Sequence, residues 1–367
     1  LSELTWVREN VRGRVRSWDE KYEEIDYDVA RARRGVYQWP HGAYTLAAIR
    51  EHGGICVDQG YYATITARAF GIPSLLFVGF GRRGPHAWFG YLEDRREWVL
   101  DAGRYERDRY ATGHALDPQM NQAMTDHDVQ YACDRAIRSD QFEQARGLAR
   151  LAAVLADLGH LEAAGDVASR SAGEVRIYNK PWRIQEQILR DRGRDEALYK
   201  LLDQKADAFR DYPDFVASIR RKQAALLAGA GRSRRAEQLL ERGQRDVDDE
   251  DRDDLVNVLA TQRIEMAYNK GEYEDAREEF EDLLDDQRDG GNKVVPLIRG
   301  YLKLTRETKQ TEEGARFLRG YVKSLARRAD DPVNEAALLK LLVQAYVNDG
   351  DARRAERVRD DIGRLLK

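Results

Sequence analysis

An internal repeat in the second half of the chain limits the possible folds more than any other feature. Alanines recur with a nearly constant spacing of 39, 40, 39 and 40 residues, at Ala197, Ala236, Ala276, Ala315 and Ala355. The sequence around them is rich in Ala, Leu, Arg, Glu and Asp, and its apolar residues follow a helical period. A repeat of this length is typical of stacked helix pairs, because each pair leaves an apolar face that only its neighbour can bury.

The clearest unit runs from Met266 to Phe280 and contains the pattern Tyr-x-x-Gly-x-Tyr-x-x-Ala. This pattern resembles the tetratricopeptide repeat, although the spacing is longer than the roughly 34 residues usual in that family. The resemblance implies a turn at Gly271 and a close crossing of two helices at Ala276. We therefore predict an all-α, tetratricopeptide-like helical solenoid over residues 126–367. Such solenoids commonly bind peptides or partner proteins, and they also serve as rigid spacers.

Residues 1–125 have a different pattern, in which helix-like segments precede strand-like ones. Apolar residues at helical spacing predict an N-terminal helix through Leu4, Val7, Val11 and Val15. The stretch from Cys56 to Phe70 also predicts a helix, because Gly71 and Pro73 are typical of a helix end. Strand-like runs follow at Ser74–Phe80, His86–Leu92 and Glu97–Asp101, and we expect the residues from Arg104 to Pro118 to be polar and irregular.

Cys56 follows two glycines and begins the predicted helix. The first turn of a helix has unpaired N–H groups and the positive end of the helix dipole, both of which favour an anion. A thiol in this position ionises more readily, and the thiolate is the nucleophile. Gly53 and Gly54 are expected to leave room for a substrate backbone. The other cysteine, Cys133, has no such surroundings and is expected to be a packing residue.

A nucleophilic cysteine needs a base, and the base needs a group that orients it. His86 begins one strand-like run and Asp101 ends the next, with a polar turn between the two runs. In a tight hairpin these two residues would be near-diagonal partners on neighbouring strands. The layout therefore predicts a thiol on a helix tip with an imidazole and a carboxylate on adjacent strands.

Four motifs in this order resemble the transglutaminase-like superfamily, a branch of the papain-like cysteine enzymes. They are Gly-x-Cys-x-Asp at 54–58, Arg-Ala-Phe-Gly-Ile-Pro at 68–73, His-Ala-Trp at 86–88 and Trp-Val-Leu-Asp at 98–101. The resemblance covers about the first third of the chain and departs from the family at Gly60, where Ala is usual, and after Asp101, where Pro is common. It implies an α+β papain-like domain over residues 1–125, with Cys56 as nucleophile, His86 as acid and base, and Asp101 orienting His86.

Papain-like enzymes complete their oxyanion hole with a side-chain donor from upstream of the nucleophile. Gln38 and Trp39 lie in that direction, and an amide or an indole N–H could serve. The alternative, which we favour, places Trp39 in the core and Gln38 on the surface. Asp58 is expected to cap the helix or to hydrogen-bond locally, and Trp88 to lie in the core.

The resemblance implies a cysteine-dependent acyl-transfer enzyme that acts on protein or peptide amides through a thioacyl intermediate. Hydrolysis, as in a protease or amidase, is favoured over transfer to an amine, because water is always present. No metal or organic cofactor is implied. The alternative is a catalytically inactive transglutaminase-like scaffold, in which the helical repeat recruits a protein partner and the N-terminal domain only binds.

The composition of the chain is evidence against several other classes of protein. The chain has 367 residues with a net charge of -4, and its charged residues, 34% of the total, are interspersed. We therefore expect neither a nucleic-acid-binding protein nor a membrane-spanning one. We expect a soluble protein, and because the sequence begins with Leu1, an upstream leader stays open. The cations Arg232, Arg234, Arg235 and Arg252 and the acidic run from Asp248 to Asp251 are expected to be solvated surface. The same expectation applies to His114 and His127.

Overall fold

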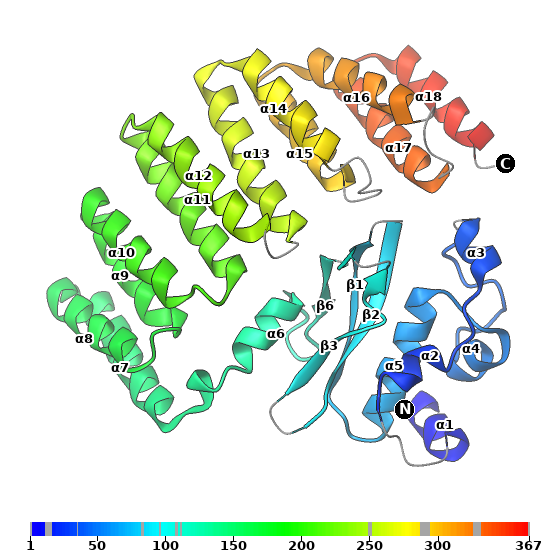
Figure 1. Cartoon of the computed structure of the whole chain (residues 1–367), viewed down its shortest axis with the longest axis horizontal. Helices are drawn as coiled ribbons and strands as arrows, with labels where there is room; N and C mark the ends of the chain where they lie inside the picture. The colour runs from blue at the N-terminus through cyan, green and yellow to red at the C-terminus, as the bar shows by residue number, and fades with distance from the viewer. Residues whose placement is uncertain are drawn as a thin grey trace. The chain divides into compact units, whose positions relative to one another are not determined.

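The computed structural model describes residues 2–11, 17–34, 36–81, 84–94, 97–106, 109–110, 112–248, 252–286, 294–325 and 332–365. An N-terminal region of helices and strands is followed by a run of helices, as Figure 1 shows. The last strand is β7 (Ala123–Met124), and the next element is the helix α6 (Asp126–Ala132). By its contacts the chain divides into two compact units, residues 1–126 with 267–367, and residues 127–266.

The N-terminal region begins with helices that lead to Cys56. They are α1 (Ser2–Asn10), α2 (Glu20–Glu23), α3 (Val29–Arg33), α4 (Leu46–His52) and α5 (Cys56–Ala69). The predicted N-terminal helix is present but ends at Asn10. Val7 and Val11 are buried as their spacing suggested, whereas Val15 lies outside the described residues. The helix predicted from Cys56 is confirmed, and Gly71, at φ 80°, follows its end.

Five strands form an antiparallel sheet in the order β3-β2-β1-β6-β7. The strands β1 (Ser74–Gly81), β2 (Gly84–Leu92) and β3 (Trp98–Ala102) match the three predicted runs, and β2 and β3 form the expected hairpin. The strand β6 (Thr112–Leu116) pairs with β1 and corrects the prediction that residues 104–118 are irregular. Its sequence is short and polar, but pairing with the central strand places Ala115 opposite Phe77, where it is fully covered. Two short strands, β4 (Tyr105–Glu106) and β5 (Arg109–Tyr110), pair with each other.

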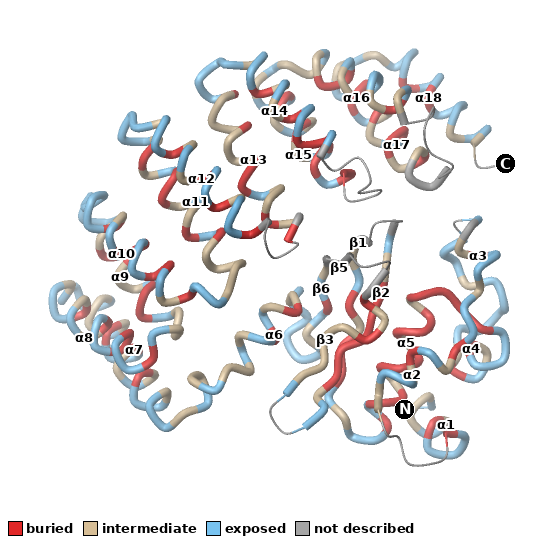
Figure 2. Tube along the Cα trace, viewed as in Figure 1, coloured by how far each residue is buried: buried red, intermediate tan, exposed pale blue. Residues whose placement is uncertain are grey.

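The helix α5 packs against β1 and β2, and the core of this region lies between them (Figure 2). Ala63 and Ala67 contact the cluster that contains Phe89 and Tyr91. A Cβ atom added to Gly60 would lie 2.6 Å from Leu76 Cδ1, so the helix approaches the sheet closely at this glycine. Small residues on one face of α5 therefore set the distance between helix and sheet.

The rest of the chain consists of antiparallel helix pairs. Their helices are α7 (Asp140–Asp157), α8 (Leu161–Glu174), α9 (Asn179–Asp191), α10 (Asp195–Ala208), α11 (Pro213–Gly229), α12 (Ser233–Asp248), α13 (Asp253–Lys270), α14 (Tyr273–Asp286), α15 (Val294–Glu307), α16 (Thr311–Leu325), α17 (Pro332–Asn348) and α18 (Ala352–Leu365). Within residues 127–266, each helix from α7 to α12 packs on the next, and the same holds from α15 to α18. The predicted helical repeat is confirmed. No helix among the described residues has the length and apolar character that crossing a membrane requires.

Each pair turns at a residue with positive φ. Glycines occupy this position at Gly159, Gly193, Gly231, Gly271 and Gly350, with φ between 62° and 84°. In the remaining described pair the turn falls on Lys309, with φ 62°. The hydrogen bonds are equivalent, because the amides of Gly271 and Lys309 donate to the carbonyls of Tyr268 and Arg306, respectively. The turns are therefore 34, 38, 40, 38 and 41 residues apart.

In each pair the two helices cross at the residue five positions after the turn residue. The alignment of the repeat on its alanines, as made from the sequence, is therefore corrected. Ala164, Ala236, Ala276 and Ala355 stand at this position and are completely buried. In the two other pairs the equivalent residues are Leu198 and Gly314, one position away from Ala197 and Ala315. A Cβ atom on Gly314 would lie 2.5 Å from Thr305 Oγ1, which explains the glycine there. The regular alanine spacing thus mixes two positions of the repeat.

Lys309→Gly is expected to stabilise the protein by about 1 kcal/mol, because a residue with a Cβ costs about 1–2 kcal/mol in the left-handed region. Chemical denaturation of the full chain measures the change. Gly271→Lys is the matched control at the equivalent turn and should be destabilising by a similar amount. A loss of stability in Lys309→Gly would mean that contacts of the lysine side chain outweigh the backbone strain.

Candidate functional site

Cys56 is the first residue of α5 and is almost buried, with 9% of its surface exposed. The two glycines before it have separate structural roles. Gly53 ends α4 at φ 74°, and a Cβ there would lie 2.5 Å from the carbonyl oxygen of Asp26. A Cβ on Gly54 would lie 2.4 Å from the Cβ of Asp58. The space at these glycines is therefore filled by the protein's own backbone and side chains, which corrects the expectation that it is left for a substrate.

Asp58 fixes the first turn of α5. Its Oδ2 accepts hydrogen bonds from the Ile55 amide at 2.8 Å and from Arg31 Nη1 at 2.6 Å. Its Oδ1 accepts one from the Tyr44 hydroxyl at 2.9 Å. Arg31 and Asp58 are 2% and 1% exposed, so this is a buried ion pair with additional hydrogen bonds. The predicted capping role of Asp58 is confirmed.

The same arginine holds the loop that carries Gln38 and Trp39. Arg31 Nε donates to the carbonyl of Val36 at 2.9 Å, and Nη2 donates to that of Tyr37 at 3.0 Å. The guanidinium also lies over the Trp39 ring, 5.4 Å from its centroid. Burial, and then the charge of Asp58, raise the pKa of Tyr44, so its hydroxyl stays protonated and can donate. A single network centred on the buried pair Arg31 and Asp58 therefore ties α3, this loop and the Cys56 turn together.

The two candidate oxyanion donors differ in their surroundings. Gln38 is exposed, whereas Trp39 is half-buried. Trp39 Nε1 is buried and has no hydrogen-bond acceptor among the residues that the structure describes. Buried donors are nearly always paired, so an unpaired one needs an explanation. Trp39 packs against the core cluster that contains Leu46 and Ile49, and Gln38 lies on the surface, as the favoured alternative expected. A role of either residue in an oxyanion hole stays a prediction.

His86 lies on β2 and Asp101 near the end of β3, on adjacent strands as predicted. The register shifts between Phe89 and Tyr91, so that Leu100 and Asp101 together lie opposite Gly90. His86 Nε2 is 2.7 Å from the carbonyl oxygen of Gly103. This main-chain contact orients the imidazole. The catalytic roles of Cys56, His86 and Asp101 stay predictions.

The side chains of β2 alternate between two environments. Phe89 and Tyr91 point toward α5, where they contact its alanines. His86 and Trp88 occupy the alternate positions and point to the other face, with their rings stacked at 6.1 Å. Trp88 is completely buried, as predicted, and stacks on Phe77 across the strand pair. Cys56 thus belongs to the helix that covers one face of the sheet, whereas the side chain of His86 projects from the opposite face.

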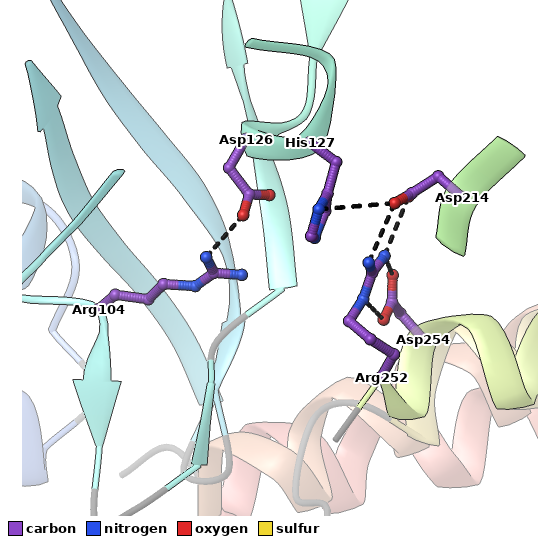
Figure 3. A network of polar contacts seen from close by, with 6 residues as sticks. All are labelled: Arg104, Asp126, His127, Asp214, Arg252 and Asp254. Atoms are coloured by element: carbon purple, nitrogen blue, oxygen red, sulfur yellow. Dashed lines mark hydrogen bonds and ion pairs between the residues drawn. The ribbon is translucent and has the colours of Figure 1, made fainter. Parts of the chain in front are cut away.

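Arg104 is buried beside this imidazole face. Its guanidinium lies 5.4 Å from the centroid of the Trp88 ring, and Nη1 is 2.6 Å from Asp126 Oδ2 (Figure 3). Arg104 therefore does not belong to an irregular polar surface, because it is 6% exposed and packed between an aromatic ring and a carboxylate.

A second network, also drawn in Figure 3, joins α6, α11 and the start of α13 within residues 127–266. Arg252 is 7% exposed and donates to both oxygens of Asp214 and to both of Asp254, at 2.9–3.0 Å. His127 Nδ1 lies 3.7 Å from Asp214 Oδ2. The expectation that Arg252 and His127 are solvated surface is therefore wrong, because Arg252 is 7% exposed and Asp214, far away in the sequence on α11, contacts both residues. Residues 249–251 of the acidic run lie outside the described residues, and His114 is exposed as expected.

Acidification tests the Arg252 network. Burial alone would raise the pKa of the Asp254 carboxyl, but the hydrogen bonds and charge of Arg252 hold it below its ordinary value. A depressed carboxyl pKa contributes stability that is complete above the unfolded-state pKa and is lost as pH falls through the folded-state pKa. We expect the difference in unfolding free energy between wild type and Asp254→Asn to shrink as pH falls from about 6 to about 2. A difference that stays constant over this range would contradict the assignment.

Gly103→Ala is expected to destabilise the protein by about 2–4 kcal/mol, through backbone strain and overpacking. Gly103 has φ 74°, and a Cβ there would lie 2.3 Å from the ring of Tyr22. Thermal unfolding measures the effect. Gly42→Ala is the control, because Gly42 also has positive φ but no atom within 4 Å of an added Cβ. Equal losses in the two variants would mean that the Tyr22 contact adds nothing.

Of the comparisons with known proteins, only the one with solved structures finds matches. No protein-family model and no curated protein matches the chain. Solved structures that resemble part of it include a signal transduction ATPase with a tetratricopeptide repeat sensor from Pyrococcus horikoshii, at 14% identity over 61% of this chain and 36% of that one, with TM-score 0.36. BtubC from P. vanneervenii aligns at 15% identity over 62% and 91%, with TM-score 0.33. A Rap protein complexed with Competence and Sporulation Factor aligns at 14% over 62% and 66%, also with TM-score 0.33. A likeness this weak does not define the fold. The helical repeat is established by the helix pairs of this chain.

Sequence analysis missed Arg31 and Tyr44, the two partners of Asp58. Both lie in a segment without a clear periodic pattern, so no local signal marks them. Among the described residues, no three His, Cys, Asp or Glu side chains gather where they could hold a metal ion.

Proposed function

We propose that this chain is a cysteine-dependent acyl-transfer protein that acts on protein or peptide amides, with Cys56 as its nucleophile. The observation that supports it best is the setting of Cys56. The thiol lies in the first turn of a 14-residue helix, where the positive end of the helix dipole favours an anion. The hydrogen bonds of Asp58 with Arg31, Tyr44 and the Ile55 amide hold this turn in place, and such rigidity is what a nucleophile requires.

The proposed chemistry uses His86 as acid and base. The thiolate attacks the amide carbonyl carbon, a C–S bond forms, and the C–N bond breaks as the leaving amine takes a proton from the His86 imidazolium. Neutral His86 then removes a proton from water, which attacks the thioester. The C–S bond breaks, and a carboxylic acid and the thiolate are released. We favour water over an amine as the acceptor. Asp101 would orient His86, and the helical repeat would bind a protein.

A second candidate is a protein-binding scaffold without chemistry, and the register of β2 favours it. His86 shares the Trp88 face of the sheet and contacts the Gly103 carbonyl, whereas α5 covers the other face. In this candidate the imidazole stays bound to the Gly103 carbonyl and does not activate the thiol. The helical repeat would then carry the function through a bound partner.

Labelling with an amide-mimicking cysteine electrophile, followed by intact mass, separates the two candidates. The acyl-transfer proposal expects one added group near neutral pH in wild type and in Cys133→Ala, and none in Cys56→Ala. His86→Ala should slow labelling by about tenfold or more, since a paired imidazole keeps the thiol ionised. Equal, slow labelling of wild type and His86→Ala would overturn the catalytic proposal and leave the scaffold.

A further inference from the structure

The helices α16, α17 and α18, labelled in Figure 1, carry the residues that line a groove of about 640 Å³. Its floor is apolar and consists of Val322, Leu339, Leu342, Tyr346 and Val358, all of them largely buried. Leu339, Leu342 and Tyr346 are spaced three and four residues apart, so they form one stripe along α17. A floor of this kind suits the apolar face of another helix.

The rim of the groove is strongly basic. It carries Arg319, Lys323, Arg354, Arg357 and Arg364 against two acidic residues, Glu335 and Asp361. The whole chain has a net charge of -4, so this local excess of cations is unlike the rest of the molecule. Repulsion among clustered cations is unfavourable unless anions neutralise it.

Internal ion pairs account for only part of this charge. Arg354 pairs with Asp351, and Arg364 pairs with Asp361. Lys323 lies in the last turn of α16, where the helix dipole favours a cation. Arg319 and Arg357 have neither explanation, and neither forms an ion pair with any residue that the structure describes. Two arginines from different helices thus face one apolar groove, and neither has an acidic partner among the described residues.

We infer that this groove binds an amphipathic helix of a partner protein, with apolar side chains on one face and Asp or Glu along its edges. The apolar floor matches the apolar face, as in other complexes in which a helix lies in a groove. The arginines on either side would pair with the edge carboxylates and fix the register. This inference is independent of the chemistry proposed for Cys56.

Fluorescence anisotropy with a synthetic helical peptide tests the inference on the full chain. The probe carries Leu at positions i, i+3, i+4 and i+7 and Glu along both edges. One comparison peptide replaces the leucines with Ser, and another replaces the glutamates with Lys. We expect the probe to bind, each replacement to weaken binding by about tenfold or more, and added salt to weaken it further.

Arg319→Glu combined with Arg357→Glu should reduce probe binding by about tenfold or more. The matched control combines Arg316→Glu with Arg353→Glu, which reverses two exposed cations on the same helices outside the groove lining. The control should bind within about twofold of wild type, and Cys56 labelling should be the same in both double variants. Equal losses in the two double variants would overturn the inference. So would tight binding of the Ser peptide or of single-stranded DNA, because the surface would then attract any polyanion.

Discussion

Asp58→Ala is expected to lower the free energy of unfolding by about 3–5 kcal/mol, the range for breaking a buried ion pair from one side. The substitution leaves the guanidinium of Arg31, which is 2% exposed, without its carboxylate. It also removes the acceptor for the Ile55 amide and the Tyr44 hydroxyl. Chemical denaturation of the full chain measures the loss, and hydrogen exchange should locate it in the first turns of α5.

Two further variants make this prediction specific. Glu312→Ala removes an exposed ion pair with Arg316, whose side chains are 71% and 74% exposed, and should cost less than about 1 kcal/mol. Asp58→Asn keeps an acceptor for the Ile55 amide but loses the charge, and it should slow labelling of Cys56 without changing that of Cys133. A loss below about 1 kcal/mol in Asp58→Ala would show that water replaces the carboxylate at this turn.

Glu186→Ala is expected to cost a similar amount, about 3–5 kcal/mol, within residues 127–266. Glu186 is 3% exposed and accepts hydrogen bonds from Lys205 and Lys222, both at 2.6 Å. Burial by itself raises the pKa of its carboxyl, and the two lysines more than reverse this, so the carboxylate is charged at neutral pH. Without it, the ammonium group of Lys205, also 3% exposed, would be buried beside a second positive charge.

A compensating variant separates charge from packing at this site. Glu186→Leu combined with Lys205→Leu replaces the buried pair with apolar side chains and leaves Lys222, 41% exposed, to reach water. Its stability should return to within about 1–2 kcal/mol of wild type. Asp203→Ala, which removes a partly exposed pair with Arg220, is the control and should cost less than about 1 kcal/mol. If the double variant is no more stable than Glu186→Ala, lost packing rather than an unpaired charge explains the effect.

The extent to which the fold follows from the sequence differs along the chain. Gly71 and Pro73 end α5 where local chemistry requires an end, and the turn glycines of the repeat take positive φ for the same reason. The strand β6 was missed because its sequence is short and partly polar, and Ala115 is covered only through pairing with β1. The alanine spacing suggested a uniform period, but the helix crossings fall at Leu198 and Gly314 in two of the pairs, because the crossing is set by its distance from the turn.

The sequence by itself determined the elements whose signals are local: the helix that begins at Cys56, the hairpin that carries His86 and Asp101, and the helix pairs of the repeat. Hydrophobic period, helix-ending residues and turn residues act within a few positions of one another, so the amino-acid sequence alone is enough to find them. Only the tertiary structure decided which face of β2 carries His86, that Arg31 and Tyr44 hold the Cys56 turn, and that Arg252 is buried. These features depend on side chains that are far apart in the sequence and meet only when the chain has folded, because burial and charge pairing are properties of the packed surroundings.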